Sequence, residues 1–210
     1  VPVRWIWPKR IPKGKFTVFA GDPGLGKSYM TLDIAARVSL GGPWPDGCGV
    51  APKGKVMIIT VEDDVGDTIR PRLDALGADV DSILVMDALV RHHNTQMGLS
   101  LKEHLLELEL AIRAYEITLL ILDPVLAFTG ARTDTHKSSD VRSMLAPLAG
   151  VANRTACAIL AIMHLNKRSG ELNSIYRITG SGDFAAAARS VFIIGSHPDI
   201  EGCRIFAPVK

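Results

Sequence analysis

Short continuous apolar runs alternate along the chain with stretches in which apolar residues recur every three or four positions. The runs are rich in β-branched residues and have the length of buried strands, whereas the periodic stretches are typical of amphipathic helices. The predicted strands are residues 16–20, 56–61, 83–86, 117–123, 157–163, 190–194 and 203–207. The predicted helices are residues 27–40, 65–76, 101–114 and 141–153, with a short helical turn at 185–188.

This alternation of strands and helices predicts an α/β fold with a mostly parallel central sheet and helices on both faces. In such a sheet, ligands gather at the carboxyl ends of the strands. The chain has 210 residues, of which 47% are hydrophobic, so we expect a single domain over residues 1–210. The sequence does not begin with Met and stops directly after a predicted strand, so a fragment of a longer chain stays an alternative.

Composition and charge indicate where the protein is expected in the cell, but they say little about its activity. The formal net charge of +2 is too small to indicate a nucleic-acid partner by itself. The three cysteines are widely spaced and lack the paired spacing of a zinc site, so we expect reduced thiols in a cytoplasmic protein. No apolar run reaches the roughly 18 residues of a membrane span, and residues 1–12 lack the apolar core of a signal peptide, which predicts no membrane segment.

A phosphate-binding motif, Gly-x-x-x-x-Gly-Lys-Ser, stands between the first predicted strand and the first predicted helix, which is the context that it requires. Its residues are Gly21, Asp22, Pro23, Gly24, Leu25, Gly26, Lys27 and Ser28. The glycines let backbone N–H groups surround a phosphate, and the helix N-terminus directs partial positive charge at it. We expect this loop, with Tyr29, to bind a nucleoside triphosphate, Lys27 to reach the β- and γ-phosphates and Ser28 to ligate Mg²⁺. An incidental Gly-rich turn is the alternative.

Two acidic positions follow buried strands and are expected at the same edge of the sheet as the phosphate loop. Asp123 closes an aliphatic run in the Walker B pattern, in which the carboxylate holds the Mg²⁺ shell, although an Asp before Pro124 also makes an ordinary turn. Glu62 is the first residue of an acidic cluster with Asp63 and Asp64. We expect Glu62 to be the general base for the attacking water. The alternative is a solvated helix start, where negative charge suits the dipole.

Polar residues after the strand at 157–163 complete the set of candidates. His164 is expected to sense the γ-phosphate, with a structural histidine as the alternative. Two polar loops at 129–140 and 167–177 suit a single strand of nucleic acid, which is bound through phosphate contacts and stacking, and they equally suit ordinary solvated loops. Their basic and aromatic residues are Arg132, His136, Lys137, Lys167, Arg168, Tyr176 and Arg177.

Together, these residues resemble the RecA-like ATPases, and most closely the RepA-like branch that includes hexameric plasmid replicative helicases. The resemblance covers nearly the whole chain. It rests on the phosphate loop at 21–28, Val-Glu-Asp-Asp at 61–64, Leu-Ile-Leu-Asp-Pro at 120–124, His-Leu-Asn-Lys at 164–167, and Gly-Ser-Gly at 180–182 with Arg189 following.

The resemblance implies a RecA-like fold and a homo-oligomer, such as a hexameric ring, with active sites between subunits. It also implies a basic residue inserted from the neighbouring subunit, for which Arg189 is our prediction, with a structural ion pair as its alternative role. Lys167 and Arg177 are the other candidates for this finger. In the family, the catalytic glutamate follows the strand after the phosphate-loop helix, which is the place of Glu62. Mobile loops that face DNA would correspond to the two basic loops.

The sequence thus predicts an ATP- and Mg²⁺-dependent ATPase motor that acts on single-stranded DNA, in plasmid, phage or mobile-element replication. The alternative from another class is a KaiC-like regulatory ATPase that binds ATP to assemble or to recruit partners, without translocation. A small-molecule kinase is disfavoured because no Arg-rich lid segment is present and several predicted strands follow His164. The motifs do not distinguish ATP from GTP.

Overall fold

A seven-stranded sheet forms the centre of the computed structural model, which describes residues 2–87, 89–92, 95–129, 138–165 and 183–210. The strand order is β11-β10-β3-β9-β8-β4-β5. The strands are β3 (Phe16–Gly21), β4 (Lys55–Thr60), β5 (Ile83–Asp87), β8 (Ile117–Asp123), β9 (Ala158–His164), β10 (Ser190–Ser196) and β11 (Arg204–Pro208). Only the pair of β10 and β11 is antiparallel within this sheet, so the predicted α/β fold with a mostly parallel sheet is confirmed.

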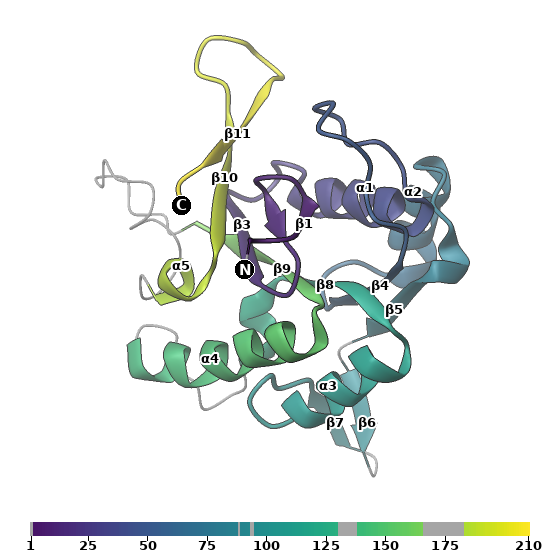
Figure 1. Cartoon of the computed structure of the whole chain (residues 1–210), viewed down its shortest axis with the longest axis vertical. Helices are drawn as coiled ribbons and strands as arrows, with labels where there is room; N and C mark the ends of the chain where they lie inside the picture. The colour runs from purple at the N-terminus through teal and green to yellow at the C-terminus, as the bar shows by residue number, and fades with distance from the viewer. Residues whose placement is uncertain (1, 88, 93–94, 130–137, 166–182) are drawn as a thin grey trace.

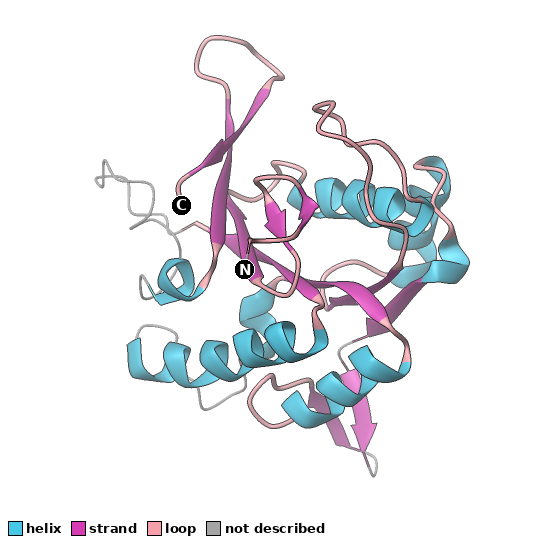
Figure 2. Cartoon of the chain, viewed as in Figure 1, coloured by secondary structure: helices cyan, strands magenta, loops and turns pink. Residues whose placement is uncertain are grey.

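Helices cover both faces of the sheet (Figure 1). One face carries α1 (Lys27–Leu40) and α2 (Arg70–Ala75), and the other carries α3 (Leu105–Ala114), α4 (Ser138–Thr155) and α5 (Asp183–Ala187). Figure 2 shows the strands as a layer between these two groups of helices. None of the described helices has the length and hydrophobicity needed to cross a membrane.

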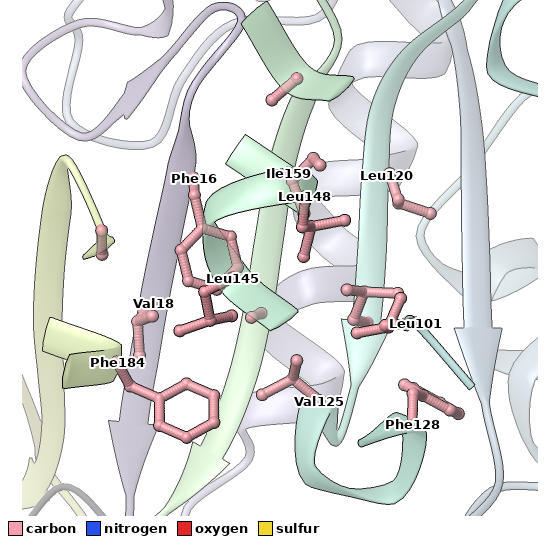
Figure 3. Close-up of a cluster of buried hydrophobic side chains, with 14 of the residues drawn as sticks. Phe16, Val18, Leu101, Leu120, Val125, Phe128, Leu145, Leu148, Ile159 and Phe184 are labelled. Carbon is pink, nitrogen blue, oxygen red and sulfur yellow. The ribbon is translucent and has the colours of Figure 1, made fainter. Parts of the chain in front are cut away.

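Each face of the sheet has its own hydrophobic cluster. Phe16 and Val18 of β3 belong to the cluster under α4, together with Leu145 of that helix (Figure 3). Phe19 belongs to the cluster under α1, because successive residues of a strand point to opposite faces. Residues 119–122 of β8 are fully buried, as expected for a central strand that is covered on both sides.

The seven predicted strands correspond to the seven strands of the sheet, with bounds that agree within two residues. The predicted start of the third long helix is wrong, because α3 begins at Leu105 and not at residue 101. A turn occupies the preceding residues. In it, the Ser100 N–H donates to Nδ1 of His104 at 3.0 Å, and the His104 N–H donates to the carbonyl oxygen of Ser100 at 2.9 Å.

Several short elements were not predicted as separate elements, because runs of two to five residues are too short to show a clear period. Two hairpins lie outside the main sheet, and three short helical turns connect its elements. The hairpin strands are β1 (Trp5–Trp7), β2 (Ile11–Pro12), β6 (Leu89–His92) and β7 (Thr95–Gly98). The turns are η1 (Val65–Ile69), η2 (Val80–Ser82) and η3 (Val125–Phe128). The helix predicted over 65–76 is therefore a π-helical turn, η1, followed by α2.

The N-terminal hairpin packs on the same face as α1 through stacked aromatic rings. Trp7 stacks on Trp44, from the loop after α1, with ring centroids 4.7 Å apart. Trp7 also stacks on Phe206 of β11, with centroids 6.0 Å apart. Trp44 is buried and donates its indole N–H to the carbonyl oxygen of Ile6. These contacts join β11 to the N-terminal hairpin and to the loop that follows α1.

Candidate functional site

The turn between β3 and α1 has the backbone conformation of a phosphate loop. Gly24 and Gly26 have φ angles of 77° and 79°, in the left-handed region that favours glycine. A Cβ atom added to either residue would meet no atom within 4 Å, so the backbone conformation, rather than crowding, requires glycine there. Gly26 directly precedes the first turn of α1, whose N-terminus attracts anions.

Gly21 is required for a different reason. A Cβ atom on Gly21 would lie 2.5 Å from the carbonyl oxygen of Ile194 in β10, which is far inside contact distance. The close pairing of β3 and β10 therefore excludes a side chain at this point. The first glycine of the motif thus serves sheet packing, whereas the later two shape the loop.

Lys27 holds its ammonium group inside the loop. Its side chain is buried, and Nζ donates a hydrogen bond to the carbonyl oxygen of Asp22 at 2.8 Å. Burial lowers the pKa of Lys27, and the negative charges of Asp123, Asp22 and Glu62 oppose this change. The positive charge therefore lies among the carboxylates of the candidate site, where it is available to a phosphate.

Strand order brings His164, Asp123 and the acidic turn after β4 to the same edge of the sheet as the phosphate loop. β9 lies between β3 and β8, and β4 follows β8, so four parallel strands end side by side. Gly21 is opposite His164 in the β3–β9 pair, and Thr60 is opposite Asp123 in the β8–β4 pair. The phosphate loop, His164, Asp123 and the acidic turn after β4 therefore follow one another along the edge.

Asp123 is buried next to the phosphate loop and accepts a side-chain hydrogen bond from Ser28. Burial raises the pKa of Asp123 to about 6, the hydrogen bond from Ser28 opposes the rise, and the negative charges of Glu62 and Asp63 add to it. Mg²⁺ prefers oxygen ligands and is bound through few carboxylates. The adjacent hydroxyl and carboxylate of Ser28 and Asp123 fit this ion.

Glu62 and His164 face each other across this edge. Oε1 of Glu62 lies 3.7 Å from Nε2 of His164, and the two residues come from the ends of β4 and β9, on either side of β8. The side chain of Glu62 is 51% exposed, so its carboxylate is accessible to water. The structure therefore brings the predicted base and the predicted sensor together, and their roles stay predictions.

The three acidic residues after β4 have different contacts. Asp64 caps the helical turn η1, because its Oδ1 accepts hydrogen bonds from the N–H groups of Gly66 and Asp67 at 2.7 and 3.0 Å. Asp63 forms an ion pair with Arg72 of α2. The alternative role of the cluster, a helix start, therefore applies to Asp64. Glu62 instead lies next to His164 at the candidate site.

A pocket of about 350 Å³ lies beside the phosphate loop. It is lined by Leu25, Gly26, Tyr29, Met30, Ile194, Arg204, Ile205 and Phe206. Its lining is mostly apolar, and a nucleoside attached to phosphates in the loop has space to enter it. Tyr29 was a predicted binding residue, whereas the residues from β10 and β11 were missed. No local motif marks these residues, because only the pairing of β10 with β3 brings them to the loop.

Arg189 lies at the opposite end of the sheet from Lys27. It is exposed and directly precedes β10, and its N–H donates to the carbonyl oxygen of Phe16 at 2.8 Å. Ile194 is opposite Gly21, at the start of the loop. At about 3.3 Å per residue, the chain from Arg189 to Ile194 covers about 16 Å, so Arg189 lies about that far from the loop along the strand. The other basic-loop and motif candidates lie outside the described residues: Arg132, His136, Lys137, Asn166, Lys167, Arg168, Tyr176, Arg177, Gly180, Ser181 and Gly182.

One protein-family model matches most of the chain. The family model described as "AAA domain" matches residues 1–170, a range that contains the phosphate loop, Glu62, Asp123 and His164. The chain belongs to this AAA-domain family. An AAA domain with this fold is a nucleotide-dependent ATPase domain of the P-loop type. No curated protein shows a significant match to the chain.

Proposed function

We propose that this AAA-domain chain is the ATPase of an oligomeric motor that is stimulated by single-stranded DNA, similar to the RepA-like replicative helicases. The observation that supports it most is the meeting of Lys27, Ser28, Asp123 and Glu62 at one edge of the sheet. These residues include a phosphate ligand, two Mg²⁺ ligands and an accessible carboxylate, which together are the groups needed for hydrolysis of a triphosphate.

Each residue has a defined task in this proposal. Lys27 exchanges its hydrogen bond with Asp22 for the β- and γ-phosphates, and backbone N–H groups of the loop bind the same phosphates. Ser28 and Asp123 would hold Mg²⁺, which supplies charge neutralisation for the triphosphate. Glu62 accepts a proton from the water that attacks the γ-phosphate. His164, 3.7 Å from Glu62, is close enough to respond to the state of that phosphate.

Stimulation by single-stranded DNA is the test of the motor function. Phosphate release from MgATP should increase several-fold when single-stranded DNA is added, and the Lys27→Ala variant should be inactive with and without DNA. The basic residues of the loops at 129–140 and 167–177 support this expectation. If DNA changes neither the rate of hydrolysis nor ATP-dependent assembly, the result contradicts the motor function and favours a regulatory ATPase.

Arg189 tests the proposal that active sites lie between subunits. Its side chain starts at the far end of the sheet from its own phosphate loop, so it can assist hydrolysis only in a neighbouring subunit. Arg189→Ala should therefore lose activity, and mixing it with inactive Lys27→Ala protein should restore part of the phosphate release. In the mixture, some interfaces combine an intact Lys27 from one variant with an intact Arg189 from the other.

The matched control for this mixing experiment is the double variant Lys27→Ala/Arg189→Ala. Added to Arg189→Ala protein, it supplies the same extra subunits but no intact arginine, so it should restore nothing. Absence of recovery over a full range of mixing ratios with the single variants would contradict a role of Arg189 in the neighbouring subunit.

A further inference from the structure

The acidic turn after β4, residues 61–64, is tied to α2 by an ion pair. Nη1 of Arg72 lies 3.1 Å from Oδ2 of Asp63, and the two side chains are 38% and 30% exposed. Another pair on the same helix, Arg70 with Asp74, joins residues one turn apart, and its side chains are 58% and 53% exposed. The Arg72 pair is thus the more buried of the two, and it links two separate segments.

The two segments that this ion pair joins differ in how firmly the fold holds them. Arg72 is followed directly by Leu73 and comes three residues after Ile69, and both of these side chains are buried in the cluster under α1. Its backbone is therefore fixed against the sheet. Glu62, in the acidic turn, has weaker restraints, because its N–H donates to the hydroxyl of Thr60 at 3.3 Å and about half of its side chain is exposed.

The charge of Asp63 also acts on the candidate metal site. Asp63 lies close enough to Asp123 for its negative charge to help raise the pKa of that carboxyl group. An unpaired Asp63 would be free to turn toward Mg²⁺ or to repel the γ-phosphate. Pairing with the guanidinium group of Arg72 restrains this carboxylate and balances its charge.

We propose that Arg72 is a positioning residue for ATP hydrolysis: it holds Asp63, and thereby fixes the turn that directs Glu62 at the attacking water. The inference rests on the proposed role of Glu62 as the base. The Arg72 side chain bonds to Asp63, which lies outside both the phosphate loop and the pair of Mg²⁺ ligands. Its effect should therefore fall on the rate of hydrolysis rather than on the affinity for nucleotide.

Arg72→Ala tests this role, with Arg70→Ala on the same helix as the matched control. Turnover of MgATP in Arg72→Ala should fall about 10- to 100-fold, the usual effect of removing a group that orients a ligand or catalytic residue. The dissociation constant for MgADP should change less than about threefold, since the phosphate ligands remain. Arg70→Ala should keep normal turnover. Equal turnover in the two variants would overturn the proposal.

Asp63→Asn shows whether Arg72 acts through Asp63, and it also covers the case in which Arg72→Ala does not fold. Asp63→Asn keeps the shape of the side chain and should by itself lower turnover with unchanged MgADP affinity. The double variant should be no slower than the slower single variant, because both remove one interaction. Full activity of Asp63→Asn, or losses that multiply in the double variant, would overturn the proposal.

Glu62→Gln separates this inference from the proposed function. If Glu62→Gln hydrolyses ATP normally, Glu62 is not the base, and both the proposed function of this residue and the inference on Arg72 are wrong. If Glu62→Gln is inactive and Arg72→Ala is fully active, the base assignment stands and only the positioning role fails.

Discussion

Glu62→Gln should bind MgATP as tightly as the unsubstituted chain and hydrolyse it about 10²- to 10⁴-fold more slowly, the usual contribution of a general base. Glutamine has nearly the same shape as glutamate, but its amide cannot take a proton from water. Lys27, Ser28 and Asp123 are unchanged, so the phosphate and Mg²⁺ ligands remain. Calorimetry measures the binding, and single-turnover phosphate release measures the hydrolysis.

Asp64→Asn is the matched control for Glu62→Gln, because it removes one negative charge from the same turn. Asn caps a helix about as well as Asp, so the hydrogen bonds to the N–H groups of Gly66 and Asp67 remain and the fold is kept. Turnover in Asp64→Asn should stay within about twofold of the unsubstituted rate, since the capping side chain does not face the site. A similar loss in both variants would show that the charge of the turn matters, and not the base.

The phosphate loop and Asp123 were predictable because each belongs to a local pattern. A glycine motif between a strand and a helix fixes the loop, and an aliphatic run that ends in Asp123 fixes a central strand. Parallel strands end at the same edge, so sequence alone brings these residues together. The order of the strands in between was not predicted, because it depends on pairings between distant segments such as β3 and β9.

The separate roles of the three acidic residues in the turn after β4 could not be predicted from sequence. Glu62, Asp63 and Asp64 are consecutive residues of similar chemistry, so sequence alone left a catalytic and a helix-start role open for the cluster. In the structure, the N–H groups of η1 bind Asp64, and Arg72 binds Asp63. The partners of Asp64 are two and three residues away in sequence, whereas the partner of Asp63, Arg72, lies in the separate helix α2.

The pocket beside the phosphate loop could not be predicted from sequence for a related reason. Tyr29 follows the phosphate loop directly, whereas Arg204 and Phe206 lie far along the chain in β11. They reach the loop only because β10 pairs with β3 and carries β11 with it. The stack of Phe206 on Trp7 adds a third segment, and no repeat or motif relates these three parts of the sequence.

Asp123→Asn should make the protein more stable at neutral pH while it removes Mg²⁺-dependent hydrolysis. Burial raises the pKa of Asp123 to about 6, from an ordinary value of 3.8. Between these values the folded chain keeps a proton that the unfolded chain has lost, so the free energy of unfolding falls as pH rises through this range. Above about pH 6, the full cost of burying the charged carboxylate remains, on the order of 1–3 kcal/mol.

The asparagine side chain in the Asp123→Asn variant carries no charge and still accepts the hydrogen bond from Ser28, so this cost disappears. Urea denaturation at pH 7.5 should show the variant more stable by roughly 1–3 kcal/mol, and at pH 4 the two chains should differ little. Saturating MgATP should reverse the order at pH 7.5, because a ligand stabilises the chain that binds it more tightly. If the variant is less stable than the unsubstituted chain at pH 7.5 without nucleotide, the buried charge of Asp123 does not destabilise the fold. If MgATP stabilises the variant as much as the unsubstituted chain, Asp123 is not a metal ligand. In the proposed mechanism, the same buried carboxylate therefore costs stability in the absence of Mg²⁺ and binds the ion when it is present.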